Sequence, residues 1–257
     1  MKNDRPLILI TNDDGIDSPG IKLLAETLSN LGEIIIVAPD RQQSAVSSAL
    51  TIQRPIKVKE LKLLDKYEAY AVDGTPTDCV KLAFFSILNR KPDLVVSGIN
   101  HGLNTSVNVL YSGTVSGAIE GMLMGVNSIA ISHQSHDYTK DLSAAGEITK
   151  KVAEYTLSNN WADKFLLNIN VPDIDPNKIN GVKVARLSKS EWIDKFDKRI
   201  DPWGNTYYWF SGEYKINDED PDCDDNAIKD AFISITPLNI NFTNYEMINN
   251  LKIFEKL

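Results

Sequence analysis

The chain has 257 residues, of which 42% are hydrophobic and 24% are charged, and its formal net charge at pH 7 is −8. A chain of this length forms one large α/β domain or a domain with an appendage. The negative charge argues against a nucleic-acid polymer or an anionic membrane as a partner. The two cysteines, Cys79 and Cys223, give neither a metal-ligand spacing nor a disulfide framework, so we expect a reducing compartment.

Sequence signals for a membrane location are missing. Residues 1–6 lead directly into an apolar strand, without the apolar region and cleavage site of a signal peptide. The longest candidate for a span, Val115 to Ser132, is interrupted by Glu120 and Asn127. It also falls short of the ~20 apolar residues that a bilayer requires. We therefore expect a cytoplasmic protein without a membrane partner.

Two adjacent carboxylates follow the first predicted strand. Leu7 to Ile10 is an aliphatic run typical of a strand buried in a parallel sheet, and such sheets bind ligands at the carboxyl ends of their strands. Asp13 and Asp14 come directly after it. One of them could cap the next helix while the other stays in water, but Ser18 and Pro19 already suit the start of that helix. A hard cation held by oxygen ligands is the sharper hypothesis.

Strands and helices alternate along the chain to about residue 175. This alternation predicts an α/β fold with a Rossmann-like, doubly wound, mostly parallel sheet. Thr75 and Asp78 are predicted to form a capping box, and Tyr155 is predicted to face inward. Gly117, Gly121 and Gly125 are expected on one helix face. The predicted strands are 7–10, 34–38, 56–59, 70–72, 92–97, 127–132 and 165–172, and the predicted helices are 19–32, 75–88, 113–125 and 143–157.

The character of the chain changes beyond residue 175. Extended pieces at 182–185 and 207–210 surround a turn, and exposed aromatic residues there would serve a subunit interface or a minor core. Asp218 to Asp225 is predicted to be a solvated acidic loop. A final strand at 232–238 and a short helix follow. We therefore divide the chain into a core, 1–175, and a C-terminal oligomerisation arm with a closing strand and helix, 176–257.

Oxygen-bearing side chains also follow the other predicted parallel strands. Ser44 lies after the second strand, and Asn100 and Asn104 lie after the strand at 92–97. Ser112 and Thr114 stand at the start of a helix, where free N–H groups favour a phosphate. The asparagines could instead stabilise turns. Together these groups suit Mg²⁺, Mn²⁺ or Ca²⁺ rather than zinc or copper, so they indicate phosphoryl chemistry.

Several familiar enzyme signatures are absent, including Walker A, G-x-G-x-x-G, G-x-S-x-G and H-E-x-x-H. The acidic pair also lacks the D-x-D spacing of enzymes that form an aspartyl phosphate, which favours metal-assisted hydrolysis. Of the three histidines, His133 and His136 are expected to form local hydrogen bonds. Only His101 is kept as a candidate support for a metal ligand.

Five ordered motifs, and a sixth stretch near the C-terminus, resemble one known family. They are Thr11-Asn12-Asp13-Asp14-Gly15, Val37-Ala38-Pro39-Asp40-Arg41 with Ser44, Gly74-Thr75-Pro76-Thr77-Asp78-Cys79-Val80, Ser97-Gly98-Ile99-Asn100 with Gly102 and Asn104, Tyr111-Ser112-Gly113-Thr114-Val115, and Ser234-Ile235-Thr236-Pro237-Leu238. Together they resemble the SurE family of survival-protein nucleotidases. One departure is Gln42 and Ala45, where many members have Asn and Gly.

The resemblance implies a divalent-metal-dependent phosphatase for nucleoside 5′- and 3′-monophosphates and short polyphosphate. It implies one Mn²⁺ or Mg²⁺ per subunit, with Ca²⁺ able to replace it in a crystal. It also implies a homodimer or homotetramer in which a C-terminal arm is exchanged between subunits. By position, the implied metal ligands are Asp13, Asp14, Ser44 and Asn100, with Asp13, Asp14 and Asn100 catalytic, and the implied substrate-binding residues are Asn104, Ser112, Gly113 and Thr114.

Two rival functions stay open at this point. The first is a regulatory protein that binds a nucleotide and a metal without turnover. The second is a metal-dependent glycosyltransferase, although the D-x-D spacing usual in that class is missing from the Asp13–Asp14 pair. Release of phosphate would separate the nucleotidase from both rivals.

Overall fold

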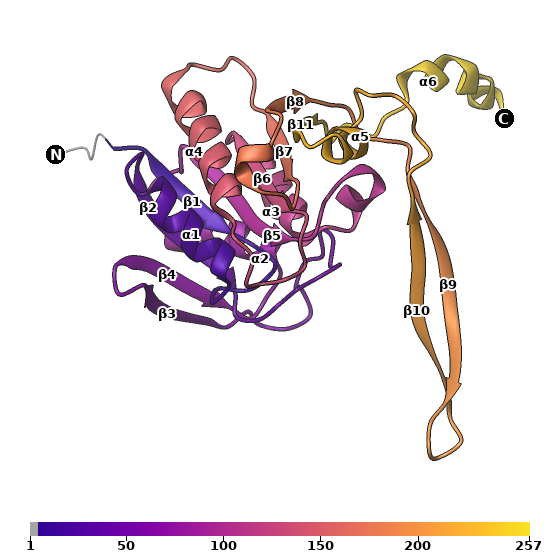
Figure 1. The fold of residues 1–257 in the computed structure, drawn as a ribbon, viewed down its shortest axis with the longest axis horizontal. Coiled ribbons are helices and arrows are strands. Elements are labelled where there is room, and N and C mark those ends of the chain that lie inside the picture. The colour runs from indigo at the N-terminus through magenta and orange to yellow at the C-terminus, as the bar shows by residue number, and fades with distance from the viewer. Residues whose placement is uncertain (1–4) are drawn as a thin grey trace.

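A computed structural model describes residues 5–257, apart from the side chain of Lys256. Most of the described strands form one nine-stranded sheet in the order β3-β4-β2-β1-β5-β6-β7-β11-β8 (Figure 1). Only the β3–β4 and β7–β11 pairs in this sheet are antiparallel. The strands are β1 (Leu7–Thr11), β2 (Glu33–Pro39), β3 (Val58–Leu63), β4 (Tyr67–Val72), β5 (Leu94–His101), β6 (Ser128–His133), β7 (Leu166–Val171), β8 (Val182–Val184) and β11 (Ile233–Leu238).

Helices cover both faces of the sheet, which confirms the doubly wound α/β prediction. α1 packs beside α4 on one face, and α2 packs beside α3 on the other. Strand β1 is buried on both sides: Ile8 and Ile10 join the core under α1 and α4, whereas Leu7 and Leu9 join the core under α2. The helices are α1 (Pro19–Leu28), α2 (Pro76–Leu82), α3 (Gly113–Leu123), α4 (Ser143–Ser158), α5 (Asp224–Lys229) and α6 (Tyr245–Leu251), with shorter helical turns η1 (Ala83–Ile87), η2 (Ser106–Leu110), η3 (Pro176–Lys178) and η4 (Lys252–Lys256).

The predicted helix starts have the expected chemistry. Ser18 caps α1 through its hydroxyl, and Pro19 occupies the first turn. Thr75 and Asp78 form the capping box of α2: the Thr75 hydroxyl accepts the Asp78 N–H at 3.1 Å, and the Asp78 carboxylate accepts the Thr75 N–H at 2.9 Å. Asp78 therefore has the structural role that the sequence indicated, and it is separate from the carboxylates at the end of β1.

A long antiparallel hairpin stands away from the sheet. Its strands are β9 (Glu191–Ile200) and β10 (Thr206–Lys215), joined by the turn at residues 201–205. Figure 1 shows the hairpin extending beyond the rest of the molecule. Apart from Tyr214, which is half-buried, its aromatic residues are exposed in the single chain, so they do not form a minor core. The exposed aromatics of this segment are Trp192, Phe196, Trp203, Tyr207, Tyr208, Trp209 and Phe210.

Two sequence predictions about helix faces were wrong. Tyr155 on α4 was predicted to face the core, but it is 63% exposed. Its ring meets the edge of the Trp161 ring instead of entering the core. Gly125 is not part of the glycine face of α3, because the helix ends at Leu123. Gly125 instead adopts a φ of 75° in the turn that follows.

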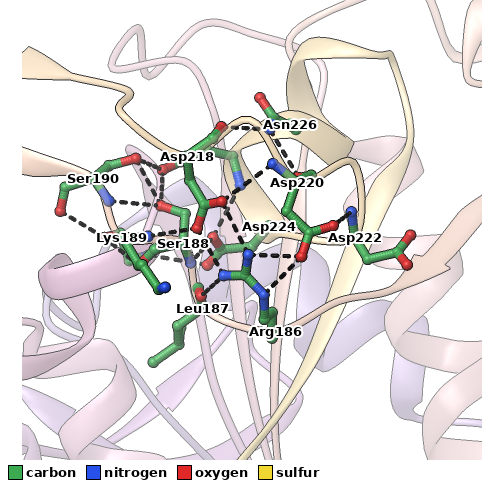
Figure 2. Close-up of polar contacts among 12 residues, drawn as sticks. Arg186, Leu187, Ser188, Lys189, Ser190, Asp218, Asp220, Asp222, Asp224 and Asn226 are labelled. Atoms are coloured by element: carbon green, nitrogen blue, oxygen red, sulfur yellow. Dashed lines mark hydrogen bonds and ion pairs between the residues drawn. The ribbon is translucent and has the colours of Figure 1, made fainter.

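Only part of the acidic stretch from Asp218 to Asp225 is the predicted solvated loop: Glu219 and Asp222 are exposed, whereas other carboxylates are held by Arg186 and by backbone N–H groups (Figure 2). Arg186 donates to Asp218 at 2.7 and 2.9 Å and to Asp220 at 2.7 Å. The hydrogen bonds from this guanidinium hold the pKa of Asp218 below its usual range. Asp224 and Asp225 are buried at the start of α5. An exposed arginine and buried hydrogen-bond donors thus compensate part of a run of like charges that looks solvated in sequence.

Within residues 5–257, no helix combines the length and apolar character that a membrane span needs.

Gly20 marks the point where α1 lies directly on β5. A Cβ atom on Gly20 would lie 2.3 Å from the Ile99 carbonyl oxygen. We therefore expect Gly20→Ala to lower the free energy of unfolding by about 1–3 kcal/mol, as overpacking of a core does. Gly146→Ala on α4 is the matched control, because its nearest contact would be 3.2 Å and alanine favours a helix. Denaturant unfolding of both variants checks this; equal stability would contradict it.

Candidate active site

The carboxyl ends of β1, β2 and β5 border a pocket of about 600 Å³. The structure brings together every predicted site residue at this edge of the sheet. Asp13, Ser44, Asn100, Asn104 and Ser112 line the pocket directly. Gly113 and Thr114 lie against Asp13, and Asp14 lies beneath Tyr138.

Asp13 is buried against the first turn of α3. Its carboxylate accepts a hydrogen bond from the Thr114 hydroxyl, and a Cβ atom on Gly113 would lie 2.8 Å from the Asp13 Cβ. Only glycine fits there without moving the carboxylate. Burial, and to a lesser degree the charge of Asp14, raise the pKa of Asp13 to about 6, although hydrogen bonds from Thr114 lower it. The ionised form of Asp13 is therefore disfavoured in the folded protein, and a nearby positive charge would stabilise it.

Asp14 is held by the end of β5 and by the loop after β6. The Tyr138 hydroxyl donates to Asp14 Oδ1 at 2.8 Å. The backbone N–H of His101 donates to Asp14 Oδ2 at 3.2 Å, and His101 Nδ1 lies 3.3 Å from the same oxygen. His101 was predicted to support a metal ligand, and its ring does lie directly beside Asp14, a proposed ligand.

The turn between Asp14 and α1 depends on Asn12, a residue to which the sequence motifs gave no separate role. The Asn12 side chain donates to the Gly15 carbonyl at 2.9 Å and to the Ser18 hydroxyl at 2.7 Å, and it accepts the Gly15 N–H at 3.2 Å. Gly15 has a φ of 96°, which glycine adopts without strain. Asn12 thereby fixes both carboxylates relative to β1.

Ser44 reaches the site on the loop after β2. The loop is joined to β1 by a hydrogen bond of 2.7 Å from the Gln43 N–H to the Asp13 carbonyl. The Gln42 side-chain amide donates to the Ser44 hydroxyl at 2.9 Å and to the Tyr138 hydroxyl at 3.1 Å. Gln42 therefore links two loops that border the pocket.

A buried layer of asparagines fixes Asn104. Asn170 Oδ1 accepts the Asn104 N–H at 2.8 Å, and Asn168 Nδ2 donates to the Asn104 carbonyl at 2.7 Å. The Asn104 side chain donates to the Ser132 hydroxyl at 2.9 Å. Sequence reasoning missed these supports; the signal was the two amides within the apolar run of β7. Asn100 is oriented locally, because its amide donates to the Gly102 carbonyl at 2.7 Å.

Ser112 caps α3 and accepts the Val115 N–H at 3.1 Å. The Gly113 and Thr114 N–H groups occupy the first turn, where an α-helix offers no backbone acceptor. The helix dipole places partial positive charge at this end. The first turn of α3 is thus a local source of positive character beside two carboxylates, and it suits a phosphate oxygen.

The C-terminal segment builds the far wall of the pocket. Asp224 accepts the Ser106 N–H at 2.9 Å and the Ser188 N–H at 2.8 Å, and Asp225 accepts the Tyr214 hydroxyl at 2.8 Å. Trp192 at the base of the hairpin donates to Asn108 Oδ1 at 2.7 Å. Trp192 and Tyr214 both line the pocket. Sequence reasoning missed this wall, because the contacts that tie it to the rest of the site, Asp224 with Ser106 and Trp192 with Asn108, join positions more than 80 residues apart.

The donor set fits a hard divalent cation. Its members offer carboxylate, hydroxyl and amide oxygens, which are the ligands of Mg²⁺, Mn²⁺ and Ca²⁺. Among the described residues no three His, Cys, Asp and Glu side chains lie together so as to hold a metal ion, so a cation here would need the hydroxyl of Ser44 and the amide of Asn100 beside the two carboxylates. No lysine or arginine in residues 5–257 forms an ion pair with Asp13 or Asp14. A bound cation would supply the missing positive charge.

The raised pKa of Asp13 predicts how stability of the metal-free protein varies with pH. Between pH 3.8 and about 6 the unfolded chain has lost the Asp13 proton and the folded chain keeps it, so this group's contribution to stability falls as pH rises and levels off above about 6. Asp13→Asn removes this dependence. Its free energy of unfolding relative to the parent should rise by about 1.4 kcal/mol between pH 5 and pH 8. Denaturant unfolding in chelator checks this; a pH-independent difference would contradict it.

Comparison with known proteins places this geometry in one family. The family model described as "Survival protein SurE" matches residues 8–194. A protein of Pelotomaculum thermopropionicum named 5′-nucleotidase SurE is 48% identical over 247 residues, covering 95% of this chain and 93% of the relative. One of the same name from Flavobacterium johnsoniae is 41% identical, covering 98% and 97%. The crystal structure of a SurE protein from Aquifex aeolicus superimposes with a TM-score of 0.84 at 37% identity, covering 97% of this chain and all of the other. The chain therefore belongs to the SurE family.

Proposed function

We propose that this protein is a divalent-metal-dependent phosphomonoesterase that hydrolyses nucleoside 5′-monophosphates to nucleoside and phosphate. The observation that carries the proposal is the burial of the Asp13 carboxylate against the first turn of α3, because this pairs a cation site with a phosphate site. The relatives named 5′-nucleotidase SurE support the nucleotide as substrate. We extend the proposal to nucleoside 3′-monophosphates and short-chain polyphosphate, whose reacting group is the same.

The proposed cation ligands are Asp13, Asp14, Ser44 and Asn100, for one Mn²⁺ or Mg²⁺ per subunit. When bound to these residues, a cation would supply positive charge for the phosphate and for a water molecule. Asp13, Asp14 and Asn100 are the proposed catalytic residues; either Asp13 or Asp14 would orient the attacking water or accept its proton.

Phosphate binding is assigned to the other side of the pocket. Asn104, Ser112, Gly113 and Thr114 would hold the oxygens that the cation leaves free. The N–H groups at the start of α3 already point along the helix axis, so they need no rearrangement as charge shifts during hydrolysis. The asparagine layer beneath Asn104 would keep its amide in place.

The direct test is phosphate release from a panel of nucleoside monophosphates with Mn²⁺, Mg²⁺ or chelator. We expect metal-dependent release that Asp13→Asn lowers by more than about a hundredfold, because the variant loses an anionic ligand. Asp17→Asn is the matched control, since Asp17 is exposed four positions along the same segment. Full activity of Asp13→Asn would remove the metal-centred mechanism. Absence of release from a folded, metal-loaded parent would favour the regulatory protein without turnover.

We also propose that the hairpin and the C-terminal helix form an oligomerisation arm, exchanged between the subunits of a homodimer or homotetramer. The support is the row of exposed aromatic residues on β9 and β10. In this proposal residues 1–175 are the catalytic core. Residues 176–257 contain the arm and also add the strands β8 and β11 to the edge of the core sheet. The two cysteines are free and buried, which supports a cytoplasmic location.

If the hairpin joins the subunits, shortening it should lower the number of subunits in the oligomer. Trp192 and Tyr214 pair across the two strands, so an Asn-Gly turn can replace residues 193–213 while both pocket residues stay. Light scattering should give the parent a mass of two or four times 28.6 kDa and give the variant fewer subunits. An unchanged subunit number in the variant, or a monomeric parent, would contradict the arm.

A further inference from the structure

Tyr138 lies outside every motif of the predicted site, yet it touches a proposed cation ligand. It belongs to the segment that follows β6 and lines the pocket. Its hydroxyl donates to Asp14 Oδ1 at 2.8 Å. A tyrosine hydroxyl keeps its proton at neutral pH, so it remains a hydrogen-bond donor to this carboxylate.

The ring of Tyr138 is fixed as well as its hydroxyl. It stacks on the His101 ring with centroids 4.1 Å apart and an interplanar angle of 26°. His101 itself contacts the second oxygen of the same carboxylate through its N–H and Nδ1. The stacked pair therefore brackets Asp14, one ring partner facing each carboxylate oxygen. The Asp14 side chain is only 3% exposed under this cover.

Tyr138 is also connected to the loop that carries Ser44. Gln42 Nε2 donates to the Tyr138 hydroxyl at 3.1 Å and to the Ser44 hydroxyl at 2.9 Å. One amide nitrogen carries two hydrogens and a phenol oxygen accepts while it donates, so all three bonds can exist together. The result is a continuous chain of hydrogen bonds, Asp14–Tyr138–Gln42–Ser44, between two proposed ligands on different loops.

We propose that Tyr138 is a positioning residue: it orients the Asp14 carboxylate for the cation and, through Gln42, sets its spacing to Ser44. The inference rests on the proposed function for the presence of a cation at this site. Ligating carboxylates depend on such outer hydrogen bonds, and loss of one weakens metal binding by roughly 10- to 100-fold in known sites. Tyr138 itself would neither ligate the metal nor touch the reacting phosphate.

The test is the binding of Mn²⁺ alone to the full-length protein, followed by calorimetry or by the electron paramagnetic resonance signal of free Mn²⁺. Tyr138→Phe keeps the ring stack and removes the hydroxyl, and we expect its Kd for Mn²⁺ to rise about tenfold. Gln42→Met removes the amide link at similar size, and we expect a smaller rise of the same sign. Tyr155→Phe is the matched control, because Tyr155 is exposed on α4 and does not line this pocket; its Kd should equal that of the parent.

Two further readouts separate positioning from a general structural role. The metal-free melting temperature of Tyr138→Phe should match that of the parent, because the stack is retained. At saturating Mn²⁺ the KM for the nucleotide should also be unchanged, and kcat should return toward the parent value.

Equal or tighter Mn²⁺ binding by a folded Tyr138→Phe protein would overturn the inference; tighter binding would mean that the hydroxyl competes with the cation. A parent that binds no Mn²⁺ at all would overturn it together with the metal-dependent mechanism. A parent that binds Mn²⁺ but releases no phosphate would overturn the proposed function alone, and the comparison of Kd values would still decide the role of Tyr138.

Discussion

The buried carboxylate of Asp13 is the constraint on which the site depends. A negative charge that leaves water must gain hydrogen bonds or a neighbouring positive charge. The fold places the first turn of α3 against it, and Gly113 permits that approach because a side chain there would strike Asp13. Thr114 donates from the same turn. The parallel sheet then brings the loops of Ser44 and Asn100 to the same edge, which makes the position suitable for a cation and a phosphate together.

Charge is distributed unevenly in this acidic protein. The net charge of −8 would repel an anionic substrate, so the site needs a local positive source. Outside the site, in the C-terminal segment, Arg186 pairs with Asp218 and Asp220 and offsets part of the charge of the acidic stretch. Asp224 accepts a hydrogen bond from the Ser106 N–H, and Asp225 accepts one from the hydroxyl of Tyr214, which lines the pocket (Figure 2 shows the surroundings of Asp224). Segments far apart in the sequence thus share one site.

Local sequence patterns predicted the fold well because local chemistry determined those elements. The aliphatic β1, the Ser18 cap and the Thr75–Asp78 capping box each depend on neighbours a few residues away. Tyr138, Asn168 and Asp224 could not be predicted, because their roles arise from contacts across 60 to more than 120 positions. The predictions that Tyr155 faces inward and that the whole acidic stretch is solvated failed for a related reason. Periodicity and charge density do not reveal which surface a distant segment covers.

We propose that Asp13 and the start of α3 bind a cation and a phosphate side by side. Crystals of the protein grown with Mn²⁺ and inorganic phosphate, measured at the manganese absorption edge, would locate both ions. We expect one anomalous peak per subunit at oxygen-ligand distance from Asp13, with phosphate density at the N–H groups of Gly113 and Thr114. A peak elsewhere, or none beside Asp13 at saturating Mn²⁺, would contradict it.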